Sequence, residues 1–150
     1  MKSYYEIDNF ITADERNYFL SLIDREFINH KSTKTGTDSA LNYFPIEFRG
    51  VNRVSIMKMY PNTEQPWHTD GANLKRNSLI IHPITDNYAP FSTRHGTTSS
   101  TVIVNTQEEH AVFNNEYTRL NLQIPIDLPF EELIKNKDND YWKIIKGLYS

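Results

Sequence analysis

Residues 117–126, YTRLNLQIPI, alternate between two kinds of side chain. One set is nearly all aliphatic, and the other is mostly polar: Thr118, Leu120, Leu122, Ile124 and Ile126 against Tyr117, Arg119, Asn121, Gln123 and Pro125. Successive side chains of a β-strand point to opposite faces. This segment therefore predicts a strand that buries one face against an aliphatic core, so the chain must build a sheet with a covered side.

Further short strands are predicted before this segment. They are VNRVSIMKMY, which stops before Pro61, then SLIIHPI, STVIV and HAVF, with turn-like polar segments between them. Many short strands separated by turns favour a sandwich or jelly roll. We expect the β core to extend over about residues 51–126.

Helical patterns flank this core. Thr12 with Glu15 three residues later predicts a capping box, and apolar residues then recur at helical spacing, which predicts a helix over 12–28. Short helices are expected over about 129–147, and the polar segment 30–42 is expected to be a loop. With 150 residues, the chain is predicted to form a single domain, 1–150, that is mainly β with helices on one outer face.

Composition excludes several kinds of chemistry. The chain has no cysteine, so thiolate metal sites, iron–sulfur clusters and cysteine nucleophiles are excluded. Its net charge of −3 gives no overall basic excess, and no nucleic-acid partner is expected. We see no apolar run that could span a membrane and no signal peptide, so the expected location is cytoplasmic.

The stretch PWHTDG contains the first candidate metal ligands. His68 and Asp70 are two residues apart, so on an extended chain both side chains point the same way. Taken alone, such a pair is more often only a polar pair at a strand end. His110, at the start of a predicted strand, would complete the set of two histidines and one carboxylate that binds Fe(II) with open positions. Glu64 and Glu109 are alternative carboxylates.

Other polar residues have more ordinary interpretations. Arg119 follows His110 by nine residues, and a fixed guanidinium binds a carboxylate through paired hydrogen bonds, although a solvent-facing arginine is the default. His82 lies within an apolar strand and is expected to be a hydrogen-bonded core histidine. Asn114 is expected to hold a turn, and the Arg94-His95 pair borders either the site or solvent.

The order of these residues resembles a known family. Over roughly residues 54–127, the stretches MYPNTEQPWHTDGANLKRNSLIIHPITDN and VIVNTQEEHAVFNNEYTRLNLQIPID resemble the Fe(II)/2-oxoglutarate-dependent dioxygenases, nearest to the aspartyl/asparaginyl β-hydroxylase-like branch. The opening YEIDNFITADE is similar to the lead-in helix of such enzymes. The resemblance implies a double-stranded β-helix (jelly roll) in which the aliphatic face of 117–126 packs on the N-terminal helix while Arg119 and Asn121 face the barrel interior.

The resemblance also implies roles for individual residues. Iron ligands are implied at His68, Asp70 and His110, and Arg119 is implied to bind the distal carboxylate of 2-oxoglutarate. Arg76 matches an arginine of this branch, but Ser78 stands where the branch has a histidine. The second 2-oxoglutarate contact is therefore open between Ser78, Arg76 and His82.

The implied function is hydroxylation of an unactivated C–H bond with Fe(II), 2-oxoglutarate and O2. The expected substrate is an aspartyl, asparaginyl or prolyl group in a peptide or a free amino acid, or a chemically similar small molecule. Polar loops at 30–50 and 85–100 are expected to close over it. The alternatives are a non-catalytic jelly-roll binding module and a cupin-like metal enzyme. The oligomeric state is left open by the sequence.

Overall fold

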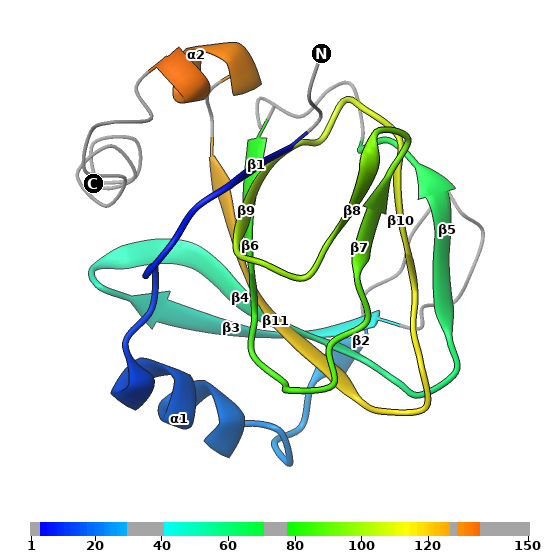
Figure 1. Ribbon diagram of the computed structural model, residues 1–150. Coiled ribbons are helices and arrows are strands. Elements are labelled where there is room, and N and C mark those ends of the chain that lie inside the picture. Colours follow the sequence, from blue (N-terminus) through cyan, green and yellow to red (C-terminus); the bar gives the residue numbers. More distant parts are fainter. Residues whose placement is uncertain (1–3, 30–40, 71–77, 127–128, 136–150) are drawn as a thin grey trace.

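The computed structural model describes residues 4–29, 41–70, 78–126 and 129–135, apart from the side chains at 52 and 53. Within these residues two antiparallel sheets face one another, with strand orders β1-β9-β6-β11-β4-β3-β2 and β5-β10-β7-β8 (Figure 1). The strands are β1 Tyr4–Glu6, β2 Ile28–Asn29, β3 Leu41–Phe48, β4 Val51–Met59, β5 Glu64–His68, β6 Ser78–Pro83, β7 Phe91–Thr93, β8 Gly96–Thr98, β9 Val102–Asn105, β10 His110–Phe113 and β11 Arg119–Ile126. The predicted jelly roll is confirmed.

One cluster of buried apolar residues lies between the large sheet and the helices, and we call it the outer core. The aliphatic face of β11 forms its centre. β11 lies between β4 and β6, and its residues Leu120 and Leu122 are fully buried. They belong to one cluster with Phe19 and Leu22, which lie in or beside helix α1 (Ala13–Ser21), and with Leu133 of helix α2 (Phe130–Lys135). The prediction that this face packs on the N-terminal helix is confirmed.

The other face of β11 points between the two sheets. Met57 and Met59 of β4 form a second buried cluster with Phe91 of β7 and Val112 of β10, which belong to the opposite sheet. Because Arg119 pairs across the ladder with Met59, and Asn121 with Met57, both polar residues lie on this interior face. Arg119 is 2% exposed and Asn121 is 0% exposed, so the barrel interior holds a cation and an amide within an apolar wall.

Helix α1 begins as predicted but ends early. The Thr12 side chain accepts from the Glu15 backbone and the Glu15 carboxylate accepts from the Thr12 backbone, so the capping box is confirmed. A hydrogen bond from Arg49 lowers the pKa of Glu15 to about 2. The helix ends at Ser21, not at residue 28, because bonds such as Leu22 N to Phe19 O tighten the chain into turns. β2 then pairs with β3, at the edge of the large sheet.

Two segments expected as loops contain strands. β3 begins at Leu41 and makes a long hairpin with β4, so the β core starts before residue 51. Residues 91–98 form the β7–β8 hairpin, whose second strand begins at Gly96 with φ +145, and Thr93 Oγ1 donates a hydrogen bond of 3.0 Å to Gly96 O. The remainder of the 30–42 loop and of the 129–147 helical segment lies outside the described residues.

The two ends of the barrel are formed by different turns and strand ends. We define the lower end, as drawn in Figure 1, by the turns 60–63, 84–90 and 114–118, where β11 begins. These turns are joined by bonds such as Asn62 N to Asn115 O and Ile84 N to Leu120 O. The upper end is where β5 ends, β10 begins and β11 ends. No helix within the described ranges is long and apolar enough to cross a membrane.

The outer core should be sensitive to truncation of β11. Leu122→Ala removes a fully buried side chain from the cluster under α1, and we expect a loss of about 2–5 kcal/mol in the free energy of unfolding. Tyr117→Ala is the control, because Tyr117 is 48% exposed just before the same strand. Urea unfolding measures both, and equal effects of the two variants would contradict this packing.

Candidate metal centre

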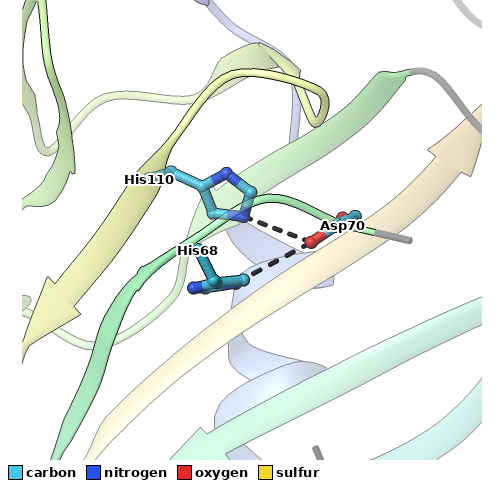
Figure 2. Close-up of side chains that lie close together, drawn as sticks. All are labelled: His68, Asp70 and His110. Atoms are coloured by element: carbon cyan, nitrogen blue, oxygen red, sulfur yellow. Dashed lines mark ion pairs between the residues drawn. The ribbon is translucent and has the colours of Figure 1, made fainter. Parts of the chain in front are cut away.

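Three potential ligands converge at the upper end of the barrel. His68 ends β5, Asp70 follows two residues later, and His110 begins β10 (Figure 2). Asp70 Oδ1 lies 3.3 Å from His110 Nε2 and 3.8 Å from His68 Nε2. The strand pairing brings the two histidines together, because His110 is the direct partner of His68 in the β10–β5 pair. Cross-strand partners project to the same face.

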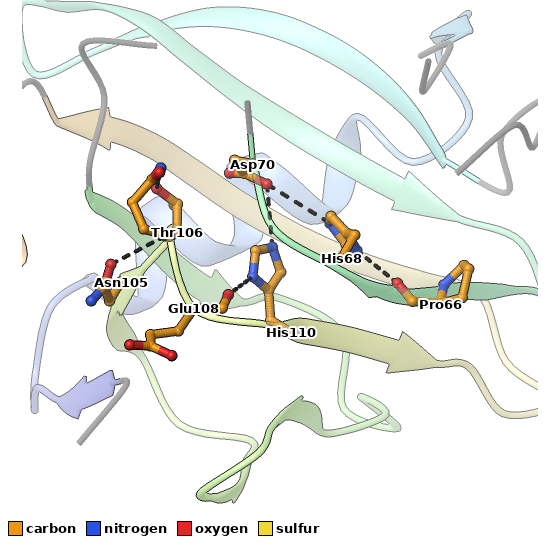
Figure 3. Close-up of polar contacts among 8 residues, drawn as sticks. Pro66, His68, Asp70, Asn105, Thr106, Glu108 and His110 are labelled. Atoms are coloured by element: carbon orange, nitrogen blue, oxygen red, sulfur yellow. Dashed lines mark hydrogen bonds and ion pairs between the residues drawn. The ribbon is translucent and has the colours of Figure 1, made fainter. Parts of the chain in front are cut away.

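Both imidazole rings are oriented by backbone carbonyls. His68 Nδ1 lies 2.7 Å from Pro66 O, and His110 Nδ1 lies 2.9 Å from Glu108 O (Figure 3). A carbonyl only accepts, so Nδ1 must carry the proton in each ring. The neutral ring then presents its lone pair at Nε2, the atom that faces Asp70. This is the outer hydrogen bond that commonly fixes a metal-ligating histidine.

Neighbouring contacts hold the ligands in place. The Asp70 backbone N–H donates to Thr106 O at 2.9 Å, which ties the segment after β5 to the turn before β10. The ring of His110 stacks on Phe91 at 5.5 Å between centroids, and the two imidazoles are 4.3 Å apart. Since Phe91 belongs to the interior cluster, His110 faces the barrel interior.

The geometry of this group fits a divalent metal ion. Its three ligand atoms all lie within 4.8 Å of one another. Ligand bonds of about 2.1 Å place adjacent ligand atoms about 3 Å apart. The two imidazole nitrogens and the carboxylate all present lone pairs to the same point. A cation bound at that point would stabilise them. A set of two histidines and one carboxylate, with no thiolate, suits Fe(II) and leaves its other coordination positions open.

The alternative carboxylates lie elsewhere. Glu109 pairs with Arg94 at 3.2 Å, and the Arg94 guanidinium stacks over Trp67 at 3.7 Å from the ring centroid. Arg94 thus links Trp67 of β5 to Glu109, which lies just before β10. Glu64 pairs with Phe113 at the other end of β5. Among the described residues, only His68, Asp70 and His110 form such a ligand group.

Arg119 is enclosed in the interior without an acidic partner. Its Nε donates to Ala89 O at 3.3 Å, its Nη2 donates to the Tyr88 hydroxyl, and its guanidinium lies 3.9 Å from the Tyr88 ring centroid. Burial lowers the pKa of Arg119 and raises that of Tyr88, and their mutual contact opposes both shifts. Tyr88 therefore stays neutral and Arg119 stays charged. No carboxylate within the described ranges pairs with this buried cation.

Tyr88 was missed by the sequence reasoning. It lies in the turn between β6 and β7, within the predicted 85–100 loop. A single aromatic residue in a polar turn has no periodicity that would mark it as a partner of a strand residue 31 positions later. Asn114 was predicted correctly as a turn residue, because its Nδ2 donates to Tyr60 O and Tyr117 O.

The other candidate co-substrate contacts are not brought beside Arg119. Ser78 is buried, but it pairs with Ile126, which places it on the face of the outer core. His82 pairs with Leu122 on that same face, and its Nδ1 lies 2.7 Å from Thr101 Oγ1. His82 is thus a hydrogen-bonded core histidine, as the sequence analysis predicted. Arg76 lies outside the described residues.

The Arg94-His95 turn remains close to the ligands. Thr93 pairs with His110 across the β7–β10 ladder, so the turn that follows it lies beside the upper end. His95 also lines a surface hollow of about 440 Å³ with Tyr4, Tyr5 and Glu6. None of the three candidate ligands lines that hollow. It is therefore a separate feature of the surface.

A metal titration tests the triad. His110→Ala removes one ligand and should weaken Co(II) binding by about 100-fold or more. His95→Ala changes an exposed histidine outside the group and should leave binding unchanged. Isothermal titration calorimetry of the metal alone measures both, and equal affinities for His110→Ala and wild type would contradict the site.

His82 should make folding sensitive to mild acid. Burial, helped by the charge of Arg16 and opposed by that of Glu15, lowers its pKa from 6.5 to about 4. The unfolded chain then binds the proton more readily, so stability is full above pH 6.5 and falls as the pH drops toward 4. His82→Gln should flatten the unfolding free energy over that window, measured by urea unfolding at several pH values. An unchanged slope would show that another group is responsible.

Comparisons with known proteins agree on the fold. No family model matches the sequence, and no curated protein matches it. A Pseudomonas putida prolyl-4-hydroxylase matches with a TM-score of 0.60 at 13% identity, over 81% of this chain and 90% of that one. A viral collagen prolyl hydroxylase from Paramecium Bursaria Chlorella virus-1, solved as a 2OG complex, matches with a TM-score of 0.55 at 12% identity, over 83% and 95%.

A third solved structure belongs to the same group. It is an oxidoreductase of the 2OG-Fe(II) oxygenase family from Burkholderia pseudomallei, with a TM-score of 0.51 at 11% identity, over 82% of this chain and 83% of that one. At these identities the likeness concerns the arrangement of the strands. The chain therefore shares the double-stranded β-helix fold of prolyl hydroxylases and other 2OG-Fe(II) oxygenases.

Proposed function

We propose that this protein is an Fe(II)- and 2-oxoglutarate-dependent dioxygenase that hydroxylates an unactivated C–H bond. The observation that carries the proposal is the convergence of His68, Asp70 and His110 at one end of a barrel whose interior also buries the unpaired cation of Arg119. A protein that only bound a metal would need the three converging ligands but not the buried cation. A metal site together with a buried cation suits a co-substrate that both chelates the metal and carries a distant carboxylate.

The three ligands have distinct tasks. His68 and His110 hold the metal through Nε2, and the carbonyls of Pro66 and Glu108 keep each ring in the tautomer that binding requires. Asp70 supplies the negative charge. Fe(II) bound there with 2-oxoglutarate and O2 supplies oxidative decarboxylation to succinate and CO2 together with hydroxylation of the substrate.

Arg119 and Tyr88 are proposed to bind the distal carboxylate. A buried guanidinium without an anion is costly, and a bound carboxylate would offset that cost through paired charge-assisted hydrogen bonds. The Tyr88 hydroxyl accepts from Arg119 and, because it stays neutral, still has its own O–H to donate to a bound carboxylate. The surrounding apolar residues, among them Met59 and Phe91, exclude water from this end of the barrel.

The proposed second co-substrate contact is Arg76 in preference to Ser78. The Ser78 side chain belongs to the face that packs on the outer core, so a contact with the co-substrate would require it to turn around the strand. Arg76, six residues after Asp70 in the sequence, is left as the candidate, and it lies outside the described residues.

The proposed substrate is an amino-acid group, prolyl, aspartyl or asparaginyl, in a peptide or a free amino acid. The prolyl hydroxylases among the solved structures support the first, and the sequence pattern near His110 supports the other two. The β7–β8 hairpin borders the ligands through the Thr93–His110 pair and is the described segment best placed to contact substrate.

Arg119→Met tests the co-substrate site. Methionine keeps much of the side-chain length but removes the charge, so 2-oxoglutarate should bind at least about 30-fold more weakly, about 2 kcal/mol. Arg25→Met changes an exposed arginine after α1 and should have no effect. Calorimetry with Mn(II) in place of Fe(II) measures both affinities. Undiminished affinity in Arg119→Met, or equal losses in the two variants, would contradict the role of Arg119.

A further inference from the structure

The strand that carries His68 is weakly paired beside the ligand itself. β5 is an edge strand of the four-stranded sheet, so β10 is its one neighbour there. Immediately before His68, two residues of β5, Pro66 and Trp67, oppose a single residue of β10. Such a bulge interrupts the ladder, and a proline has no N–H to contribute to it. Backbone pairing alone therefore holds His68 only loosely against its partner.

The bulge presents Trp67 on the outer face of this sheet. The Trp67 ring lies edge-on to Phe113 at 6.1 Å between centroids, and Phe113 is 46% exposed. Because Val112 belongs to the interior cluster, the next residue of the strand points outward. Trp67 and its neighbour His68 thus lie on opposite faces of β5, with the candidate metal centre on the inner one.

One guanidinium contacts the residue before each histidine ligand. Arg94 lies in the turn between β7 and β8. Its guanidinium carbon lies 3.7 Å from the Trp67 ring centroid, and its Nη2 donates to Glu109 Oε2 at 3.2 Å. Trp67 immediately precedes His68, and Glu109 immediately precedes His110. Since β10 lies between β5 and β7 (Figure 1), the Arg94 side chain connects the hairpin to both ligand-bearing strands.

These contacts act where the imidazole rings are oriented. His68 Nδ1 bonds to Pro66 O, and His110 Nδ1 bonds to Glu108 O. In both cases the residue that Arg94 contacts lies between the histidine and the carbonyl that orients its ring. A shift of either short segment would move a ring and its carbonyl together. Holding both segments therefore holds the separation of the two Nε2 atoms.

The ordinary interpretation of Arg94 is a surface ion pair. The Arg94 and Glu109 side chains are 52% and 51% exposed, and ion pairs so placed contribute little to folding. Stacking on an exposed aromatic ring is a similarly small effect. A small contribution still matters at a bulged edge strand, because a site that is only partly in its binding-competent arrangement loses affinity in proportion.

We propose that Arg94 is a positioning residue for the candidate metal centre, holding the bulge before His68 against β10 so that the two imidazoles keep the separation that a shared metal ion needs. The proposal rests on the metal site of the proposed function and not on 2-oxoglutarate. Arg94 itself does not contact the metal. Its effect should appear in metal affinity and in the local opening of β5, and hardly in global stability.

Arg94→Met tests the proposal in three measurements. Co(II) should bind about fivefold more weakly by isothermal titration calorimetry, because the ligands of the metal-free protein converge in a smaller fraction of molecules. Amide hydrogen exchange over 64–68 should be faster in the metal-free protein. The melting temperature should hardly change. Arg94→Lys keeps the charge beside Glu109 but not the planar stack on Trp67, so its Co(II) affinity should be intermediate.

Lys58→Met is the matched control. Lys58 Nζ also lies over aromatic rings, those of Phe27 and Tyr60 at 5.1 and 5.6 Å, but its strand β4 belongs to the other sheet. Its melting temperature should fall, because the bond from Nζ to Ile23 O is lost. Its Co(II) affinity and its exchange over 64–68 should match wild type.

A double mutant tests the route through Trp67. Trp67→Leu removes the ring on which the guanidinium lies. If Arg94 acts through this ring, adding Arg94→Met to Trp67→Leu should weaken Co(II) binding by a smaller factor than Arg94→Met does in wild type. Full additivity of the two changes would contradict this route.

The remaining outcomes separate the inference from the proposed function. If wild type does not bind Co(II), the candidate metal centre and the inference fail together. If wild type binds Co(II) but no 2-oxoglutarate, the proposed function fails, and the Co(II) affinities still decide the inference. Equal Co(II) affinity of Arg94→Met and wild type would overturn it. Equal losses in Arg94→Met and Lys58→Met would also overturn it, because the cause would then be general destabilisation.

Discussion

A guanidinium buried in an apolar barrel is the constraint on which this structure depends. Arg119 lies among residues such as Met59, and its neutral partners Tyr88 and Ala89 do not cancel its charge. Burial of an uncompensated charge is among the most unfavourable events in folding. The fold tolerates it because β11 is held firmly on its opposite face by the aliphatic core under α1 and α2. The outer core thus supports a charged site on the inner face of the same strand.

The candidate metal centre arises from equally local rules. His68 and His110 each direct Nδ1 to the carbonyl two residues earlier, and the β5–β10 register then sets the two rings against one another. Asp70 is brought to them by its backbone bond to Thr106. Ring orientation is therefore fixed before any metal binds. Such preorganisation lowers the cost of assembling the site.

The sequence predicted the parts of this molecule that follow short-range periodicity. The two faces of 117–126, the Thr12–Glu15 box and the His68–Asp70 spacing each depend on strand or helix geometry alone. The early end of α1 and the strand at Leu41–Phe48 depend on pairing with distant segments, which local pattern does not report. The aspartyl/asparaginyl branch suggested by the sequence also goes beyond what the shared fold establishes.

Side-chain direction was the least predictable feature of the site. Ser78 lies in the expected strand, but whether it faces the barrel depends on a register that a one-residue shift would reverse. The register pairs it with Ile126. Tyr88 emerged only once the turn 84–90 and strand β11 were placed in space. Long-range packing, not residue type, assigns these side chains.

The proposed function requires that one site binds Fe(II) and 2-oxoglutarate together. The direct measurement is an anaerobic titration of the Fe(II)-loaded protein with 2-oxoglutarate, followed by visible absorption. We expect a weak charge-transfer band that saturates with the co-substrate and is lost in Asp70→Ala but kept in Glu64→Ala. Absence of the band in a protein that binds Fe(II), or its persistence in Asp70→Ala, would contradict the account.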